Sequence, residues 1–222
     1  MKEDGAKLLG FVVATAVLVS LAIVFGGRLL TAAAGPENEL ITFLKRHEKE
    51  GQAFDRDGSL VGRRVSYQRI SVNLAPDGTS ATVSCTLDFT GSLGATEVSS
   101  LGYEKIPFVV KAGEWTPVDG PAPRLSAILR ALQRRSRALE AGAIDDVEGL
   151  DRAEADRVRR LSKRKYTPKA WYIRSEKDVV EVSEDYRLQG ELPERPIDEQ
   201  ATRRLSLQED ARGEFLFPHG LL

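Results

Sequence analysis

Residues 124–142, RLSAILRALQRRSRALEAG, hold the pattern that decides the fold class of this chain. Apolar residues recur there every three or four positions, with arginines between them, as on an amphipathic helix that covers a core. Gly142 can adopt the left-handed conformation that ends such a helix. The apolar stripe consists of Leu125, Ile128, Leu129, Leu132 and Leu139.

The residues after this helix predict a second helix and then strands. Val147, Leu150, Val158 and Leu161 have helical spacing. Strand alternation follows in residues 169–175 and 178–190, and residues 202–208 and 213–218 predict a last strand pair. Helices followed by antiparallel strands indicate an α+β arrangement.

Residues 138–150, ALEAGAIDDVEGL, resemble the corner of helix, glycine and second helix in the nuclear transport factor 2-like superfamily. The resemblance covers residues 124–222 and implies a curved sheet that forms a cone over the helices. Enzymes of this fold do acid or base chemistry from carboxylates or histidines inside an apolar pocket. The motif itself transfers no functional residue to this chain.

The residues before 124 predict a similar but simpler unit. Residues 37–50 have the pattern of a short amphipathic helix, and two strands flank the turn at residues 76–78. Residues 81–89 alternate apolar and polar, with Cys85 on the apolar side, and residues 94–102 and 103–117 predict a further strand pair. This order is similar to the cystatin-like version of the topology.

Prolines and a glycine in residues 117–123 stop any helix or strand. We therefore place a linker at 118–123, between a first α+β unit at 37–117 and a second, nuclear transport factor 2-like unit at 124–222. The predicted fold class is α+β, with a curved antiparallel sheet in each unit. Both units close alike, in KAGEWTP at 111–117 and ARGEFLFP at 211–218, and whether they are a duplication stays open.

The amino-terminal segment predicts the compartment. Residues 8–27, LLGFVVATAVLVSLAIVFGG, carry no charge and as a helix reach about 30 Å, the thickness of a bilayer core. We expect a cytoplasmic tail at 1–7, a transmembrane signal anchor at 8–27 and a linker at 28–36. The alternative is a secretory signal cleaved near Ala34, but Arg28 and the length of the run favour the anchor. Either reading exports the remainder, to the periplasm if the source is Gram-negative.

The composition excludes several classes of protein. With 32 basic and 33 acidic residues, the net charge of −1 gives no reason to expect a nucleic-acid partner. The single cysteine, Cys85, excludes an intrachain disulfide and zinc sites built from cysteine pairs. His47 and Glu48 begin like a zinc-protease motif, but Gly51 replaces the second histidine. We predict no metal, no cofactor and no catalytic residue.

Two groups of side chains are candidates for binding. The first is aromatic and would line a pocket in the second unit: Trp171, Tyr186, Phe215 and Phe217. Glu184 shares the face of Tyr186, and we interpret it as a carboxylate at the surface or rim of the fold. If it lies inward instead, it needs a partner such as Arg203 and becomes a candidate for acid or base chemistry.

The second group is basic. Residues 157–169 hold seven basic side chains and no acid, whereas residues 176–210 hold eleven acids and five bases. The basic run predicts a docking surface for an anionic partner. Its members are Arg157, Arg159, Arg160, Lys163, Arg164 and Lys165.

These patterns together predict a single-pass, membrane-anchored extracytoplasmic protein that is a non-catalytic binding or assembly component of a bacterial envelope complex. Its architecture is similar to inner-membrane assembly subunits of bacterial secretion machines. We expect it to contact the membrane through residues 8–27 and to have an envelope protein as partner, and a homo-oligomer stays open. The alternative is a small-molecule-binding or isomerase-like enzyme that uses the pocket of the second unit. A cone interior filled by aromatic and leucine side chains would argue against the enzyme.

Overall fold

The computed structural model describes residues 35–55, 58–144 and 152–217 and divides into two compact units, residues 1–43 and 44–222, each described by itself. The predicted span at 8–27, the cleavage site near Ala34, and Val147 and Leu150 lie outside the described residues. Within the described residues, no helix is both long and apolar enough to cross a membrane. The elements are α2 (Gly35–His47), β1 (Leu60–Leu74), β2 (Ser80–Leu93), β3 (Thr96–Lys111), β4 (Glu114–Pro117), α3 (Pro123–Ala141), α4 (Arg152–Arg160), β5 (Ser162–Ser175), β6 (Val179–Glu191), β7 (Pro196–Glu209) and β8 (Phe215–Leu216).

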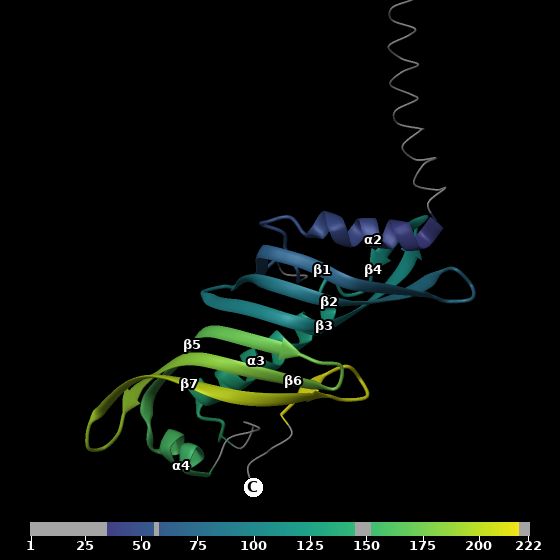
Figure 1. Cartoon of the computed structure of the whole chain (residues 1–222). Coiled ribbons are helices and arrows are strands. Elements are labelled where there is room, and N and C mark those ends of the chain that lie inside the picture. The colour runs from purple at the N-terminus through teal and green to yellow at the C-terminus, as the bar shows by residue number, and fades with distance from the viewer. Residues whose placement is uncertain (1–34, 56–57, 145–151, 218–222) are drawn as a thin grey trace, which may run out of the picture. The chain divides into compact units, whose positions relative to one another are not determined.

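The strands of residues 44–222 form one curved, mixed sheet (Figure 1). Its order is β1-β2-β3-β5-β6-β7-β8, with β4 paired to β3, which makes eight strands. The expected pair of separate antiparallel sheets is wrong, because β3 and β5 pair in parallel over residues 97–102 and 170–175. The fold class is α+β, as predicted, but the two predicted units, residues 37–117 and 124–222, share a single sheet.

The parallel pairing follows from the connection between β3 and β5. Two parallel neighbours need a long crossover, and here the chain runs through β4, α3 and α4 before it returns. β4 pairs only with residues 108–111 of β3, so the edge of β3 at residues 97–102 is left open for β5.

The two strands expected at 94–102 and 103–117 are instead the single strand β3, followed by the short β4. Gly102 lies within β3 at the last β5 pairing, with a positive φ of 148°. A Cβ at this position would meet the backbone oxygen of Ser175. The glycine therefore allows close backbone approach and does not mark a turn.

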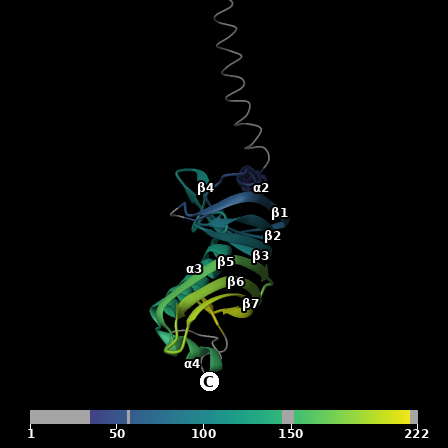
Figure 2. The same cartoon turned by 90° about the vertical axis from the view of Figure 1, so that its left-hand side faces the viewer.

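One face of the sheet is covered by α3 (Figure 2). The predicted stripe of this helix is buried, and Gly142 ends the helix with φ 75°. The alternating residues 81–89 of β2 are buried, Cys85 among them, as the pattern predicted. In residues 123–216 two helices are followed by strands that pair antiparallel, in the order that the sequence predicted.

An apolar cluster packs α4 against α3 and the strands β5, β6 and β7. It is formed by buried residues of α3, α4, β5, β6 and β7 and excludes water from this end of the molecule. Its members are Leu139, Ile144, Ala155, Val158, Leu161, Tyr166, Leu188 and Ile197.

A carboxylate from β3 caps the amino terminus of α3. The residue before the helix, Ala122, has no side chain that could do so. Glu104, 1% exposed, accepts hydrogen bonds from the backbone N–H groups of Arg124 at 2.8 Å and Leu125 at 3.0 Å. A buried anion at this position satisfies free N–H groups and favours the helix dipole. Burial nevertheless raises the pKa of Glu104 to about 7, because the cost of burying the charged form exceeds the lowering of the pKa by these hydrogen bonds.

The raised pKa predicts a pH-dependent stability. Glu104 keeps its proton up to about pH 7 in the folded protein, whereas the ordinary value is 4.5. The stabilisation that comes from keeping Glu104 protonated is therefore complete below about pH 4.5, and it is lost as the pH rises to about 7. Between these pH values, Glu104→Gln should gain stability relative to the wild type, which urea unfolding at several pH values measures.

The matched control is Glu140→Gln, because Glu140 is exposed near the other end of α3. This variant should follow the wild type at every pH. Parallel pH profiles for all three proteins would contradict the assignment of this titration to Glu104.

Candidate functional site

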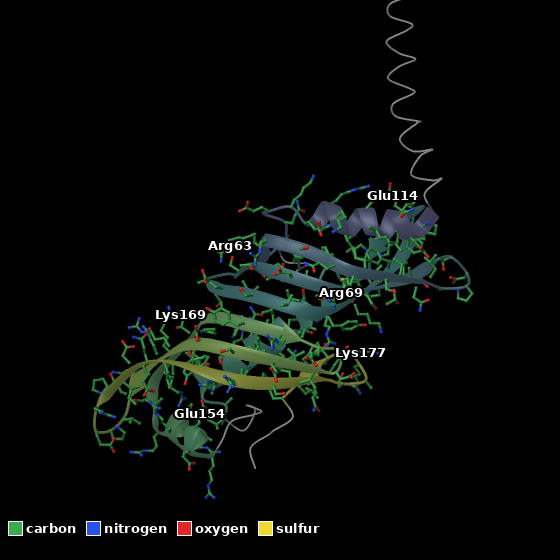
Figure 3. The ribbon with its side chains drawn as sticks, viewed as in Figure 1. Arg63, Arg69, Glu114, Glu154, Lys169 and Lys177 are labelled. Carbon is green, nitrogen blue, oxygen red and sulfur yellow. The ribbon has the colours of Figure 1, made fainter. Side chains whose placement is uncertain are left out.

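A groove of about 880 Å³ runs along the sheet, and its most exposed apolar lining residues, Leu101 and Tyr172, lie on the face that alternates away from the buried core. It crosses six strands, from Arg64 on β1 to Ser206 on β7. Lys169 on β5 and Lys177 in the turn after it lie on either side of the β5 residues that line the groove (Figure 3). We call this feature the sheet-face groove, and it is lined by Arg64, Asp88, Phe89, Thr90, Ser99, Ser100, Leu101, Tyr172, Ile173, Arg174, Glu181, Val182, Ser183, Arg204, Leu205, Ser206 and Phe217.

Strand register places the outward side chains of the groove in two rows. Asp88, Leu101, Arg174, Glu181 and Ser206 are successive cross-strand partners in one row. The other row runs in the same way through Arg64, Thr90, Ser99, Tyr172, Ser183 and Arg204. Residues from both halves of the chain therefore meet only because β3 pairs with β5.

The groove combines unpaired charges with a small apolar centre. Leu101 is 52% exposed and Tyr172 is 50% exposed, and they lie on the adjacent strands β3 and β5. Among the described residues, Arg174, Arg204 and Glu181 form no ion pair, and their charges are open to solvent or to a ligand.

The opposite face of the same strands holds a buried carboxylate, Glu184 on β6, which is 1% exposed. Its Oε2 accepts a hydrogen bond of 2.7 Å from the Tyr166 hydroxyl, and its Oε1 accepts one of 3.0 Å from the Trp171 indole. Arg135 of α3 and Arg203 of β7 each lie 3.5 Å from Oε2. The interpretation of Glu184 as a surface or rim carboxylate is therefore wrong, because the side chain is buried. The condition that an inward Glu184 would pair with Arg203 is met.

Arg203 links this cluster to α4. It forms a short ion pair with Glu154, which lies on α4 (Figure 3). Its guanidinium also lies 4.1 Å from the centre of the Tyr186 ring and 5.6 Å from that of Tyr166. Contacts of this kind stabilise a cation that is placed above the face of an aromatic ring. The guanidinium therefore lies among two carboxylates and two aromatic rings of its own chain, although its Nε and Nη1 form no hydrogen bond with the described residues.

Burial perturbs the groups around Glu184. It raises the pKa of the Tyr166 hydroxyl, and the charge of Glu184 raises it further. Burial also lowers the pKa of Arg135, and the nearby charge of Arg203 acts in the same direction.

A second cavity, of about 540 Å³, lies beside α3. Glu184 lines neither this cavity nor the sheet-face groove. The second cavity is lined by Asp55, Ser59, Leu60, Leu93, Asp119, Ser126, Leu129, Arg130, Gln133 and Glu214. The arrangement pairs the buried charge of Glu184 with donors and cations of its own chain, apart from both of these cavities.

The four aromatic candidates are distributed over different environments. Trp171 and Phe215 are buried, and the Phe215 ring lies 4.9 Å from the guanidinium of Arg124. Tyr186 stacks on Tyr166 at 5.1 Å between ring centres. These three residues line neither cavity, whereas Phe217 lines the sheet-face groove and lies 5.8 Å from the guanidinium of Arg135.

Most of the basic candidates have partners within the chain. Arg157 pairs closely with Glu199, Arg159 lies 3.2 Å from Asp156, Arg160 lies 2.9 Å from Glu194, and Lys163 lies 3.0 Å from Glu191. Arg164 instead donates hydrogen bonds to the carbonyls of Val158, Leu161 and Ala141. Lys165 is exposed. The acidic and basic segments thus neutralise each other in part, and docking by these residues stays a prediction.

Of the residues that line the groove, only Phe217 was named as a candidate from the sequence. Alternation in residues 169–175 already places Tyr172 and Arg174 on the face opposite Trp171. This signal was available, but it could not show that Arg204 and Leu101 lie beside them.

Comparisons with known proteins gave few matches. No family model matches the chain, and no curated protein matches it. A crystal structure of a protein from Shewanella frigidimarina, provisionally described as a ketosteroid isomerase, is 18% identical with a TM-score of 0.36, over 44% of this chain and 95% of that one. A structure described as an NTF2-like protein involved in plasmid conjugation is 10% identical with a TM-score of 0.26, over 71% of this chain and 75% of that one. At these scores, neither similarity carries an argument about this chain.

The Glu184 cluster predicts a large difference between two glutamates of the same strand. Glu184→Ala leaves Arg135 buried without its carboxylate and should lower the free energy of unfolding by about 3–5 kcal/mol. The control is Glu181→Gln, on the exposed face of β6, which should change it by about 0.5 kcal/mol or less. Chemical unfolding measures both, and losses of equal size would contradict the structural role of Glu184.

Proposed function

We propose that this chain is a non-catalytic binding or assembly component of a bacterial envelope complex, anchored by residues 8–27 as a single membrane-spanning helix. The apolar length of that segment supports the anchor. In this proposal the residues from Gly35 onward lie outside the cytoplasm. Residues 37–117 would be the cystatin-like part of the exported region, since one helix precedes the strands β1 to β4.

The observation that carries the proposal is the contrast between the two faces of the sheet. Inside, Glu184 is occupied by two hydrogen-bond donors and two arginines, and it lines neither cavity. A catalytic carboxylate would instead need access to a substrate. Outside, the sheet-face groove has exposed side chains and unpaired charges. This contrast favours recognition at the surface over a reaction in the cone.

The location can be tested by cysteine labelling, because the native Cys85 gives little background. It is 4% exposed, and burial raises the pKa of its thiol to about 12, with Glu104 adding to the shift. A cysteine introduced by Glu140→Cys on the exposed end of α3 should react in intact cells with a membrane-impermeant maleimide, once any outer membrane is permeabilised. The wild-type protein is the control and should stay unlabelled. Labelling that requires lysis of the inner membrane would contradict export.

The assembly proposal is tested by purifying the full-length protein in mild detergent from its own membranes. We expect a stoichiometric protein partner in the native complex. A solitary monomer with a bound small molecule would favour the alternative, a small-molecule-binding or isomerase-like protein.

The role of the basic run is tested with two double variants that break the same ion pairs. Arg160→Glu with Lys163→Glu removes positive charge, whereas Glu191→Lys with Glu194→Arg leaves it in place. If the basic residues dock the partner, only the first double variant should lose it. Loss in both would indicate damage to this end of the fold, and loss in neither would exclude docking here.

A further inference from the structure

We propose that the sheet-face groove binds an acidic oligosaccharide, a stretch of glycan whose sugar rings carry carboxylates. This inference names a ligand for the proposed binding function. It rests on that function in one respect, since such glycans lie outside the cytoplasm. The binding itself is a property of the groove and can be measured with purified protein.

The extent of the groove fits an elongated ligand. It crosses six neighbouring strands from β1 to β7. Neighbouring strands lie about 4.8 Å apart, so six of them span about 24 Å. A length of this order accommodates several linked sugar rings, which places the ligand across the strands.

The lining offers hydroxyl groups on four of its strands, β2, β3, β6 and β7. Thr90, Ser99, Ser183 and Ser206 are partly exposed, and their hydroxyls form no hydrogen bond with any residue that the structure describes. A hydroxyl both donates and accepts, as a sugar hydroxyl does. Four free hydroxyls along one groove are therefore suited to a polyhydroxylated ligand.

The centre of the groove offers an aromatic surface. Tyr172 is 50% exposed, and within the described residues its hydroxyl has no hydrogen-bond partner. An aromatic ring with a polar tip can pack against the C–H face of a sugar while its hydroxyl bonds to the sugar edge. Leu101 is exposed on the neighbouring strand and widens this surface.

The charges of the groove favour a ligand with carboxylates. Arg174, Arg204 and Glu181 form no ion pair in the described part of the chain; Arg174 lies directly across from Glu181 on the neighbouring strand, so the three side chains leave one positive charge in excess. Arg64 and Asp88 are 3.7 Å apart and largely compensate each other. Arginine binds carboxylate in a bidentate fashion, and Glu181 can accept hydrogen bonds from sugar hydroxyls.

Other macromolecules fit the groove less well. An extended peptide usually binds at the edge of a sheet through backbone hydrogen bonds, and the strands under the groove already use theirs within the sheet. An amphipathic helix needs a broader apolar surface than Leu101 and Tyr172 provide. Single-stranded nucleic acid needs several stacking platforms and a more positive groove.

The test is isothermal titration calorimetry on the full-length protein in detergent micelles, with tetragalacturonate as the probe. Maltotetraose has the same number of rings without carboxylates, and tetraglutamate has carboxylates without sugar rings. We expect tetragalacturonate to bind at least about tenfold more tightly than either of the other two.

The variants locate the binding site. Arg174→Gln with Arg204→Gln, and Tyr172→Ala, should each weaken tetragalacturonate binding by about tenfold or more, whereas Tyr172→Phe should retain most of it because the ring remains. Arg195→Gln is the matched control, since Arg195 is exposed and does not line the groove.

Three results would overturn the inference. They are no binding of tetragalacturonate up to about 10 mM, equal or tighter binding of tetraglutamate, and binding that the groove variants leave unchanged. None of these results bears on the labelling or co-purification experiments, so the proposed function stands or falls separately.

Discussion

The parallel pairing of β3 with β5 is the constraint on which the rest of this structure depends. It joins two successive sets of antiparallel strands into one sheet, over residues 97–102 and 170–175. A parallel pair requires a crossover, and α3 occupies that crossover against one face of the sheet. The other face is left uncovered by α3 and α4 and becomes the sheet-face groove. Gly102 permits this pairing to end in close contact with the backbone of Ser175.

Two buried carboxylates hold α3 in its place, one near each end. Glu104 on β3 accepts hydrogen bonds from backbone N–H groups in the first turn of α3, and Glu184 on β6 faces Arg135 in the later part of the helix. A buried charge is costly unless it is paired and hydrogen-bonded. Glu104 accepts backbone hydrogen bonds, and Glu184 accepts hydrogen bonds and lies beside two arginines, so the position of the helix against the sheet is specific.

Arg124 connects the same helix to the remaining strands. It donates to the Ser175 hydroxyl and to the carbonyls of Glu176 and Lys177 at the β5–β6 turn, and it pairs closely with Glu209 at the end of β7. The first residues of α3 are therefore fixed by both β3 and the C-terminal strands. At the other end of this unit, ion pairs between the basic segment and the acidic segment attach α4 and β5 to β6 and β7. Charges that are opposite in sequence thus serve cohesion within the chain.

The sequence by itself determined the elements whose periodicity is local. The stripe of α3, its end at Gly142 and the alternation of β2 all follow from spacing along one segment. Alternation also puts Glu184 on the face of Tyr186, but its burial and its pairing with Arg203 of β7 depend on the assembled sheet. Only the tertiary structure decided which strands are neighbours, because pairing between β3 and β5 depends on contacts more than sixty residues apart in the chain. The candidate site is non-local for the same reason: alternation exposes Tyr172 and Arg174, but only the assembled sheet brings Leu101, Ser99 and Arg204 beside them.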